Sequence, residues 1–310
     1  MASLSTRPLG HSGIQVSVLG LGCNQFGSRL DLEGTRAVLD RALARGITFL
    51  DTADRYGLTR SEELMGEVLK GRRGEVVLAT KFGLDTGDGW AGPRGTPAYV
   101  RHAVEGSLRR LQTDVIDLYY YHRPDGVTPI AETLAALDEL VSEGKVRAIG
   151  ASNFSATQIR EADAAARAHG LTRFTAVQNE YSLLHREPEA EVLGLCEQLE
   201  LAFIPFFPLA CGLLTGKYRR DQPGPEGARL SARGRIASDE QWVAVEALTA
   251  YAAARGRALT DVAIGALLTR PAVASVIAGA TRPEQLDANA AAASWEPDAA
   301  DLEALWSLLT

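Results

Sequence analysis

Short apolar runs alternate with amphipathic stretches along most of the chain. A hairpin is predicted over residues 6–19, around His11-Ser12-Gly13. Eight later apolar runs indicate short buried strands, and stretches of helical periodicity separate most of them. The predicted strands span residues 18–22, 47–51, 76–81, 115–122, 148–152, 176–180, 202–207 and 274–278. Strands that alternate with helices form a parallel sheet, and eight of them close a barrel. The pattern therefore predicts an α/β fold, a (β/α)8 TIM barrel.

The helical stretches follow the same order. Helices are predicted over residues 35–45, 61–70, 97–111, 130–143, 155–169 and 190–199, with others beginning near residue 260 and at residue 283. A loop rich in Pro, Gly and Arg (217–238) leads into an extra helix over 239–254, and a last helix covers 299–309. Ser61 is expected to cap its helix, with Glu62 and Glu63 in the first turn. No linker interrupts the pattern, so we expect one domain over residues 1–310.

Composition and charge narrow the class of protein. Hydrophobic residues make up 46% and charged residues 23%, as in ordinary globular enzymes. The net charge of −7 disfavours a nucleic-acid partner, and no apolar run approaches the roughly 20 residues of a membrane helix. The first ten residues lack the apolar core of a signal peptide, so a cytoplasmic location is expected. The number and spacing of Cys23, Cys196 and Cys211 predict neither a disulfide framework nor a zinc site. We therefore expect them to be buried, as small apolar residues are.

Polar side chains stand at the ends of five of the eight predicted strands. They are Asp51, Lys81, His122, Ser152 with Asn153, and Gln178 with Asn179. Any one of them could be a solvated loop residue, most easily Asn179. Barrel enzymes place their active sites at the carboxyl ends of the strands, so the whole set predicts a site at one mouth.

Three of these residues, together with Tyr56, have a chemistry consistent with proton transfer to a carbonyl oxygen. A tyrosine has a pKa near ~10, and a neighbouring lysine lowers it by favouring the phenolate. Asp51 would hold the Lys81 ammonium beside Tyr56, and His122 would orient the carbonyl group. No side chain delivers hydride, so a nicotinamide cofactor is implied.

Seven stretches resemble the aldo-keto reductase family, from about residue 6 to residue 293. They are GITFLDTADRYG (46–57), ATKFG (79–83), DLYYYHRPD (117–125), IGASNFS (149–155), VQNEYSLL (177–184), PFFPLACGLLTGKY (205–218) and VIAGATRPEQLDANAAA (276–292). The likeness is greatest to the branch that contains potassium-channel β-subunits and bacterial aldo-keto reductases. The catalytic tetrad of the family falls on Asp51, Tyr56, Lys81 and His122.

The resemblance also implies where a cofactor binds. Ser152, Asn153 and Gln178 would bind the nicotinamide carboxamide, and Phe206 would stack on the ring, where many relatives have tyrosine. The segment 209–217 would wrap the pyrophosphate, although by itself it could be a plain glycine-containing loop. The implied cofactor contacts are Gly22, Ser152, Asn153, Gln178, Phe206, Phe207, Pro208, Leu209, Ala210, Gly212, Lys217, Gly279, Thr281, Arg282, Gln285 and Asn289.

The cofactor's 2′-phosphate is the least determined part. The helix predicted from Pro283 would offer backbone N–H groups and the positive end of its dipole. Arg282 is the nearby cation, although it could equally be a solvated loop residue. NADP(H) is therefore favoured over NAD(H). The substrate is expected to contact Asn24, Phe26 and Trp90, although Trp90 could instead be an exposed structural residue.

The sequence thus predicts an NADP(H)-dependent oxidoreductase that interconverts an aldehyde or ketone with its alcohol, with Tyr56 as proton donor and acceptor. A cofactor-sensing subunit with negligible turnover is the alternative. A metal-dependent hydrolase is disfavoured, because His122 is the one strand-end histidine, and no metal site is predicted. The alanine-rich helices are compatible with a monomer or a homo-oligomer.

Overall fold

The computed structural model describes residues 4–220, 222 and 237–309, so most of the predicted loop 217–238 lies outside the described residues. Its main sheet has eight parallel strands in the order β10-β3-β4-β5-β6-β7-β8-β9. The strands are β3 (Leu19–Gly22), β4 (Phe49–Asp51), β5 (Val77–Phe82), β6 (Ile116–Tyr121), β7 (Val146–Ser152), β8 (Ala176–Gln178), β9 (Ala202–Phe203) and β10 (Val276–Gly279).

The two ends of this sheet meet. The Phe203 amide donates a hydrogen bond to the Ala272 carbonyl at 2.7 Å, and the Ala274 amide donates to the Phe203 carbonyl at 3.1 Å. A bridge between Phe203 and Val273 therefore joins β9 to the residues that lead into β10. The predicted (β/α)8 barrel fold is confirmed.

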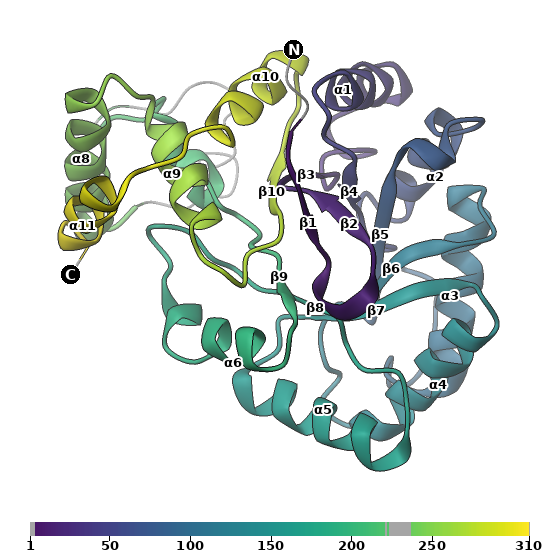
Figure 1. Ribbon diagram of the computed structural model, residues 1–310. Coiled ribbons are helices and arrows are strands. Elements are labelled where there is room, and N and C mark those ends of the chain that lie inside the picture. Colours follow the sequence, from purple (N-terminus) through teal and green to yellow (C-terminus); the bar gives the residue numbers. More distant parts are fainter. Residues whose placement is uncertain (1–3, 221, 223–236, 310) are drawn as a thin grey trace.

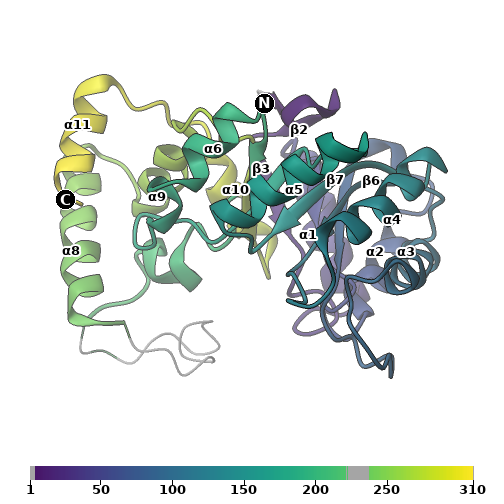
Figure 2. The ribbon, with the colours of Figure 1, turned by 90° about the horizontal axis from the view of Figure 1, so that it is seen from below.

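Helices surround the strands (Figure 1). They are α1 (Leu32–Ala44), α2 (Arg60–Val68), α3 (Pro97–Leu111), α4 (Ile130–Ser142), α5 (Ala156–His169), α6 (Val192–Gln198), α9 (Leu259–Leu268) and α10 (Pro283–Ala292). The extra helices α8 (Asp239–Ala254) and α11 (Ala299–Ser307) lie side by side at one edge of the molecule (Figure 2). An ion pair of 2.6 Å between Arg255 and Asp301 joins these two helices.

An antiparallel hairpin of β1 (Thr6–Pro8) and β2 (Gln15–Ser17) lies across the barrel and is drawn in purple in Figure 1. Its apolar side chains Leu9, Ile14 and Val16 are buried with residues of the barrel interior. The Ser17 hydroxyl accepts hydrogen bonds from the amides of Thr48 and Phe49, where β4 begins. The hairpin therefore closes the amino ends of the strands and leaves their carboxyl ends at the opposite face.

The predicted cap of α2 is wrong. Thr59 precedes the helix, and the buried Ser61 hydroxyl donates instead to the Cys23 carbonyl at 3.0 Å and shares a hydrogen bond of 2.8 Å with Thr52. Glu62 and Glu63 do lie in the first turn, as predicted, but Glu62 is buried and pairs with Arg110 at 2.7 Å. Ser61 therefore ties the loop after β4 to the end of β3.

The seventh strand is much shorter than the predicted residues 202–207. β9 has two residues, and beyond Pro205, which has no N–H to donate, Phe206 forms an isolated bridge with Glu180. This early end of the strand turns the following segment, from Phe206 onward, over the mouth of the barrel.

Close contact between α2 and α3 generates a first prediction. A Cβ atom at Gly66 would lie 2.3 Å from the Arg110 carbonyl oxygen and 2.8 Å from the Leu111 carbonyl carbon, both backbone atoms. Gly66→Ala should therefore lower the free energy of unfolding by about 1–3 kcal/mol, measured by urea denaturation, because the helices must separate.

Gly194 in α6 is the matched control, because a Cβ atom there meets no described atom within 4 Å. Gly194→Ala should raise the free energy of unfolding by about 0.5–1 kcal/mol, the ordinary gain of alanine over glycine in a helix. Equal effects of the two substitutions would contradict the close contact.

Candidate active site

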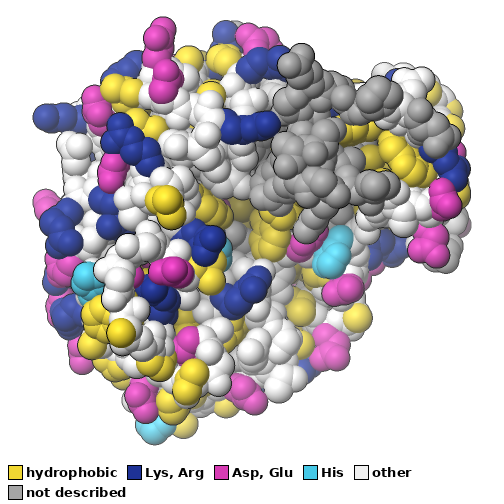
Figure 3. Space-filling view, turned by 180° about the vertical axis from the view of Figure 1, so that it is seen from behind, with side chains coloured by type: hydrophobic (Ala, Val, Ile, Leu, Met, Phe, Trp, Pro, Cys, Tyr) yellow, Lys and Arg dark blue, Asp and Glu magenta, His cyan; other side chains and the backbone are white. Residues whose placement is uncertain are grey.

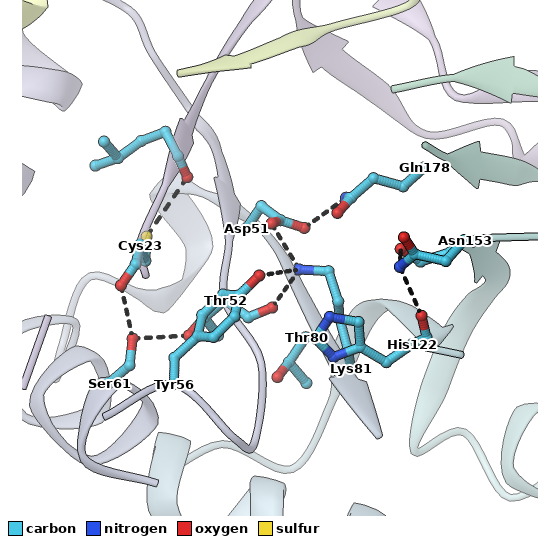
Figure 4. Close-up of polar contacts among 12 residues, drawn as sticks. Cys23, Asp51, Thr52, Tyr56, Ser61, Thr80, Lys81, His122, Asn153 and Gln178 are labelled. Carbon is cyan, nitrogen blue, oxygen red and sulfur yellow. Dashed lines mark hydrogen bonds and ion pairs between the residues drawn. The ribbon is translucent and has the colours of Figure 1, made fainter. Parts of the chain in front are cut away.

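A buried ion pair lies at the carboxyl ends of β4 and β5. The Lys81 Nζ atom is 2.6 Å from Asp51 Oδ2, and the side chains are 0% and 2% exposed. Lys81 also donates to the Thr52 carbonyl at 2.7 Å, and Gln178 donates from β8 to the other Asp51 oxygen at 2.8 Å. Figure 4 shows the ammonium group surrounded by these acceptors. The pair is therefore held from three separate strands and loops.

Tyr56 lies on the loop between β4 and α2, with its hydroxyl 3.5 Å from Lys81 Nζ. Burial raises the pKa of the phenol above its ordinary value, and the Asp51 charge adds to this, although Lys81 opposes it. The lowering of the Tyr56 pKa that was expected from Lys81 is thus present but outweighed. Tyr56 is a protonated phenol at neutral pH, as a proton donor must be.

His122 follows β6, and its ring lies edge-on to Tyr56, with 6.0 Å between ring centroids. Burial, followed by the charges of Lys81, Arg123 and Arg55, holds the pKa of His122 well below its ordinary range. Its Nδ1 atom has no hydrogen-bond partner among the described residues. The imidazole is therefore neutral and can take part in a hydrogen bond with a bound molecule.

These groups face a pocket of about 730 Å3 at the carboxyl ends of the strands. Asp51, Tyr56 and His122 line it, whereas the fully buried Lys81 lies behind them. Of the predicted cofactor contacts, all but Ala210 line the pocket: Gly22, Ser152, Asn153, Gln178, Phe206, Phe207, Pro208, Leu209, Gly212, Lys217, Gly279, Thr281, Arg282, Gln285 and Asn289. The barrel thus brings the predicted catalytic and cofactor residues to one cavity.

The three residues that were expected to contact the substrate lie in different surroundings. Asn24 lines the pocket. Phe26 is 0% exposed and belongs to the hydrophobic core. Trp90 packs against Tyr99 and His102, with ring centroids 5.2 Å away in each case. Neither Phe26 nor Trp90 is part of the described pocket wall.

One end of the pocket carries a group of cations. Lys217 and Arg282 both line it, and so does Arg29, from the loop after β3, which the sequence analysis did not single out. Burial, with the charges of Arg282 and Arg29, lowers the pKa of Lys217. Lys217 is thus close enough to both arginines to be repelled by them, and a bound anion would relieve this repulsion.

The Gln285 side chain caps the start of α10. The amides of Thr281 and Arg282 both donate to the Gln285 side-chain oxygen, at 2.7 and 3.2 Å. Both amides precede Pro283, so the anion site expected at the N–H groups of α10 stays a prediction. The Arg282 side chain, which is exposed, remains as the cation at this end.

The segment after β9 has an unusual backbone. Phe207, Ala210 and Cys211 have φ angles of 55°, 46° and 58°, in the left-handed region that favours glycine. Gly212 follows with φ of 102°, and a Cβ atom there would lie 3.2 Å from Lys217 Nζ. Glycine at this position thus permits the turn and leaves room for the Lys217 side chain.

Two more arginines line the pocket without having been predicted. Arg55 precedes Tyr56, and Arg123 follows His122. Both fall inside the quoted stretches 46–57 and 117–125, so adjacency to a catalytic residue was the signal that could have indicated them.

Known proteins resemble this chain over nearly its whole length. The family model described as "Aldo/keto reductase family" matches residues 18–309. The chain belongs to this family, and is accordingly an oxidoreductase of carbonyl and alcohol groups that uses a nicotinamide cofactor. Among solved structures it is similar to the aldo-keto reductase AKR11C1 from Bacillus halodurans in its holo form. That match has 32% identity and a TM-score of 0.83 and covers 98% of this chain and 96% of that one.

The part of the chain that the structure describes has neither a membrane-spanning helix nor a cluster of metal-binding side chains. No helix in this part of the chain is long and apolar enough to cross a membrane. Nor does the same part contain three or more His, Cys, Asp or Glu side chains grouped to hold a metal ion. Cys23, Cys196 and Cys211 are all buried, as predicted.

The low pKa of His122 generates a prediction for stability. The unfolded chain protonates this histidine near pH ~6.5, whereas the folded protein does so only at lower pH. The unfolded state therefore binds more protons below pH ~6.5, and stability falls as the pH drops. The His122 contribution to this loss has a limit of about 1.4 kcal/mol per pH unit.

His122→Gln removes this titration. Its free energy of unfolding, from urea denaturation at pH 7, 6 and 5, should fall less steeply than that of the wild type. An identical slope in the two proteins would show that the His122 pKa is not lowered by folding.

Proposed function

We propose that the protein is an NADP(H)-dependent reductase and dehydrogenase that interconverts an aldehyde or ketone with its alcohol. The observation that carries the proposal is the position of Tyr56. Its phenol faces the pocket beside neutral His122, with the Lys81 ammonium 3.5 Å behind it. A proton donor, an orienting group and a buried positive charge thus meet at one point of the pocket wall.

The pocket residues fit a nicotinamide dinucleotide. Phe206 lines the pocket with an aromatic ring, and Arg29, Lys217 and Arg282 line it with positive charge for phosphates. Ser152 and Asn153 stand at the end of β7, where they can meet the carboxamide. When bound, such a cofactor supplies or accepts hydride at the reacting carbon.

The protein's own residues handle the proton. In reduction, Tyr56 donates its phenolic proton to the carbonyl oxygen, and His122 holds that oxygen in place. The Lys81 ammonium then stabilises the phenolate that remains, and the ion pair with Asp51 keeps the ammonium aimed at it. In alcohol oxidation the phenolate accepts the proton back.

Gln178 connects the cofactor end with the tetrad. Because its side-chain nitrogen already donates to Asp51, its side-chain oxygen is the atom left for the nicotinamide carboxamide. A bound nicotinamide is thereby placed relative to Asp51, and through Asp51 relative to Lys81 and Tyr56.

The preference for NADP(H) rests on the cationic end. A 2′-phosphate adds two negative charges to the dinucleotide, and three cations line the pocket there. The cytoplasmic location and the lack of nucleic-acid partners stay predictions from the sequence, which leaves monomer and homo-oligomer both open.

Tyr56→Phe tests the proton-transfer role. We expect kcat/KM for aldehyde reduction to fall about 10²–10⁴-fold, because the general acid is lost while the ring remains. NADPH affinity, measured by fluorescence titration, should change little. Tyr251→Phe is the matched control, since that hydroxyl bonds the Asp301 carbonyl between α8 and α11. Retained turnover in Tyr56→Phe would exclude the role, and cofactor binding without turnover by the wild type would favour the cofactor-sensing alternative.

Arg282→Ala tests the cofactor preference. We expect the Kd for NADPH to rise roughly tenfold or more, because a charge-assisted hydrogen bond to phosphate is lost, and the Kd for NADH to change little. Arg257→Ala, an exposed arginine outside the described pocket wall, is the control. Equal losses for both cofactors would show that Arg282 does not bind the 2′-phosphate.

A further inference from the structure

Two arginines stand next to the reacting groups rather than at the cofactor's phosphate end. Arg55 is adjacent in sequence to Tyr56, and Arg123 to His122, and both side chains are exposed and line the pocket. Both charges act on His122, since each helps to lower its pKa. They are therefore close to the place where Tyr56 and His122 would hold a carbonyl group.

Both guanidinium groups have hydrogen-bond donors to spare. Arg55 makes one long contact of 3.4 Å, to the Asp85 carbonyl. Arg123 makes no hydrogen bond or ion pair with any residue that the structure describes. An arginine presents five N–H donors in a planar fork, so each of the two can bind an anion without giving up a strong contact.

Nearby carboxylates do not neutralise these arginines. Asp85 is paired with Arg94 at 2.7 Å. Asp125 accepts hydrogen bonds from the amides of Gly95, Val127 and Thr128. Within the described pocket wall, Asp51 is the one acidic residue, and its carboxylate is paired with Lys81.

The pocket is thus cationic in a protein with a net charge of −7. Dark blue Lys and Arg side chains lie near the centre of the face opposite the hairpin (Figure 3). Arg29, Lys217 and Arg282 lie together and suit the phosphates of the cofactor. This assignment leaves Arg55 and Arg123, next to Tyr56 and His122, without a role in binding the cofactor.

We propose that Arg55 and Arg123 form an anion subsite that recognises a carboxylate or phosphate group on the carbonyl substrate. This inference rests on the proposed function, whose substrate class it narrows from carbonyl compounds in general to anionic ones. The guanidinium forks would bind the anionic group and so hold the carbonyl group at the opposite end of the molecule toward Tyr56 and His122.

Two pairs of aldehydes test the subsite, and the members of each pair differ in charge. One pair is 4-oxobutanoate and pentanal, and the other is glyceraldehyde 3-phosphate and glyceraldehyde. With saturating NADPH, kcat/KM for the anionic member of at least one pair should exceed that for its neutral partner. The pair that shows this difference in kcat/KM identifies the anionic group that the subsite recognises, a carboxylate or a phosphate. Added salt should reduce this preference, because it screens exposed charges.

Arg55→Gln and Arg123→Gln should each reduce the anionic-to-neutral ratio of kcat/KM roughly tenfold, mainly through KM, since each removes charge-assisted hydrogen bonds. The double variant should abolish the preference. Arg109→Gln is the control, because this exposed arginine of α3 is outside the described pocket wall and the variant has the same net charge.

Binding of unreactive anions separates failure of the subsite from failure of the proposed function. Calorimetry on the NADP⁺ complex should detect succinate or inorganic phosphate with the wild type and at least tenfold weaker binding with the double variant. Turnover of all four aldehydes without a charge preference, or anion affinity that the double variant retains, would overturn the subsite alone. Absence of turnover with every aldehyde would overturn the proposed function, and the calorimetric result would still decide whether the anion subsite exists.

Discussion

The Lys81–Asp51 ion pair is the constraint on which the site depends. Removing two charges from water is costly, and a buried pair persists only when its remaining hydrogen-bonding atoms are also satisfied. Here the Thr52 carbonyl and Gln178 complete the pair. The partners come from β4, β5 and β8, and β4 pairs directly with β5. Correct closure of the barrel therefore brings the charges together, and the ammonium is positioned before any substrate arrives.

Much of this arrangement could be predicted from the sequence, because it depends on regular structure. The alternation of apolar strands and amphipathic helices is a local signal that survives folding, and it led to the barrel. Asp51, Lys81 and His122 follow directly from it, since the end of a buried strand has a fixed place at the mouth. Tyr56 was recognised through the stretch 46–57, although it lies on a loop.

The remaining differences concern loops, whose conformation depends on contacts distant in sequence. Ser61 resembles a helix cap, yet the loop turns its hydroxyl toward Cys23 and Thr52. Phe26 and Trp90 were expected in the pocket. Phe26 is instead buried in the core, and Trp90 packs against Tyr99 and His102. Arg29, Arg55 and Arg123 reach the pocket from such loops, and arginine is too common on surfaces for its position to be inferred from type alone.

The hairpin at the amino ends of the strands determines how substrate and product can enter and leave the enzyme. Its side chains Leu9, Ile14 and Val16 are packed into the barrel, so the barrel is closed at this end. Whatever enters at the carboxyl ends of the strands must leave by the same opening. Departing product and arriving substrate therefore use the same opening.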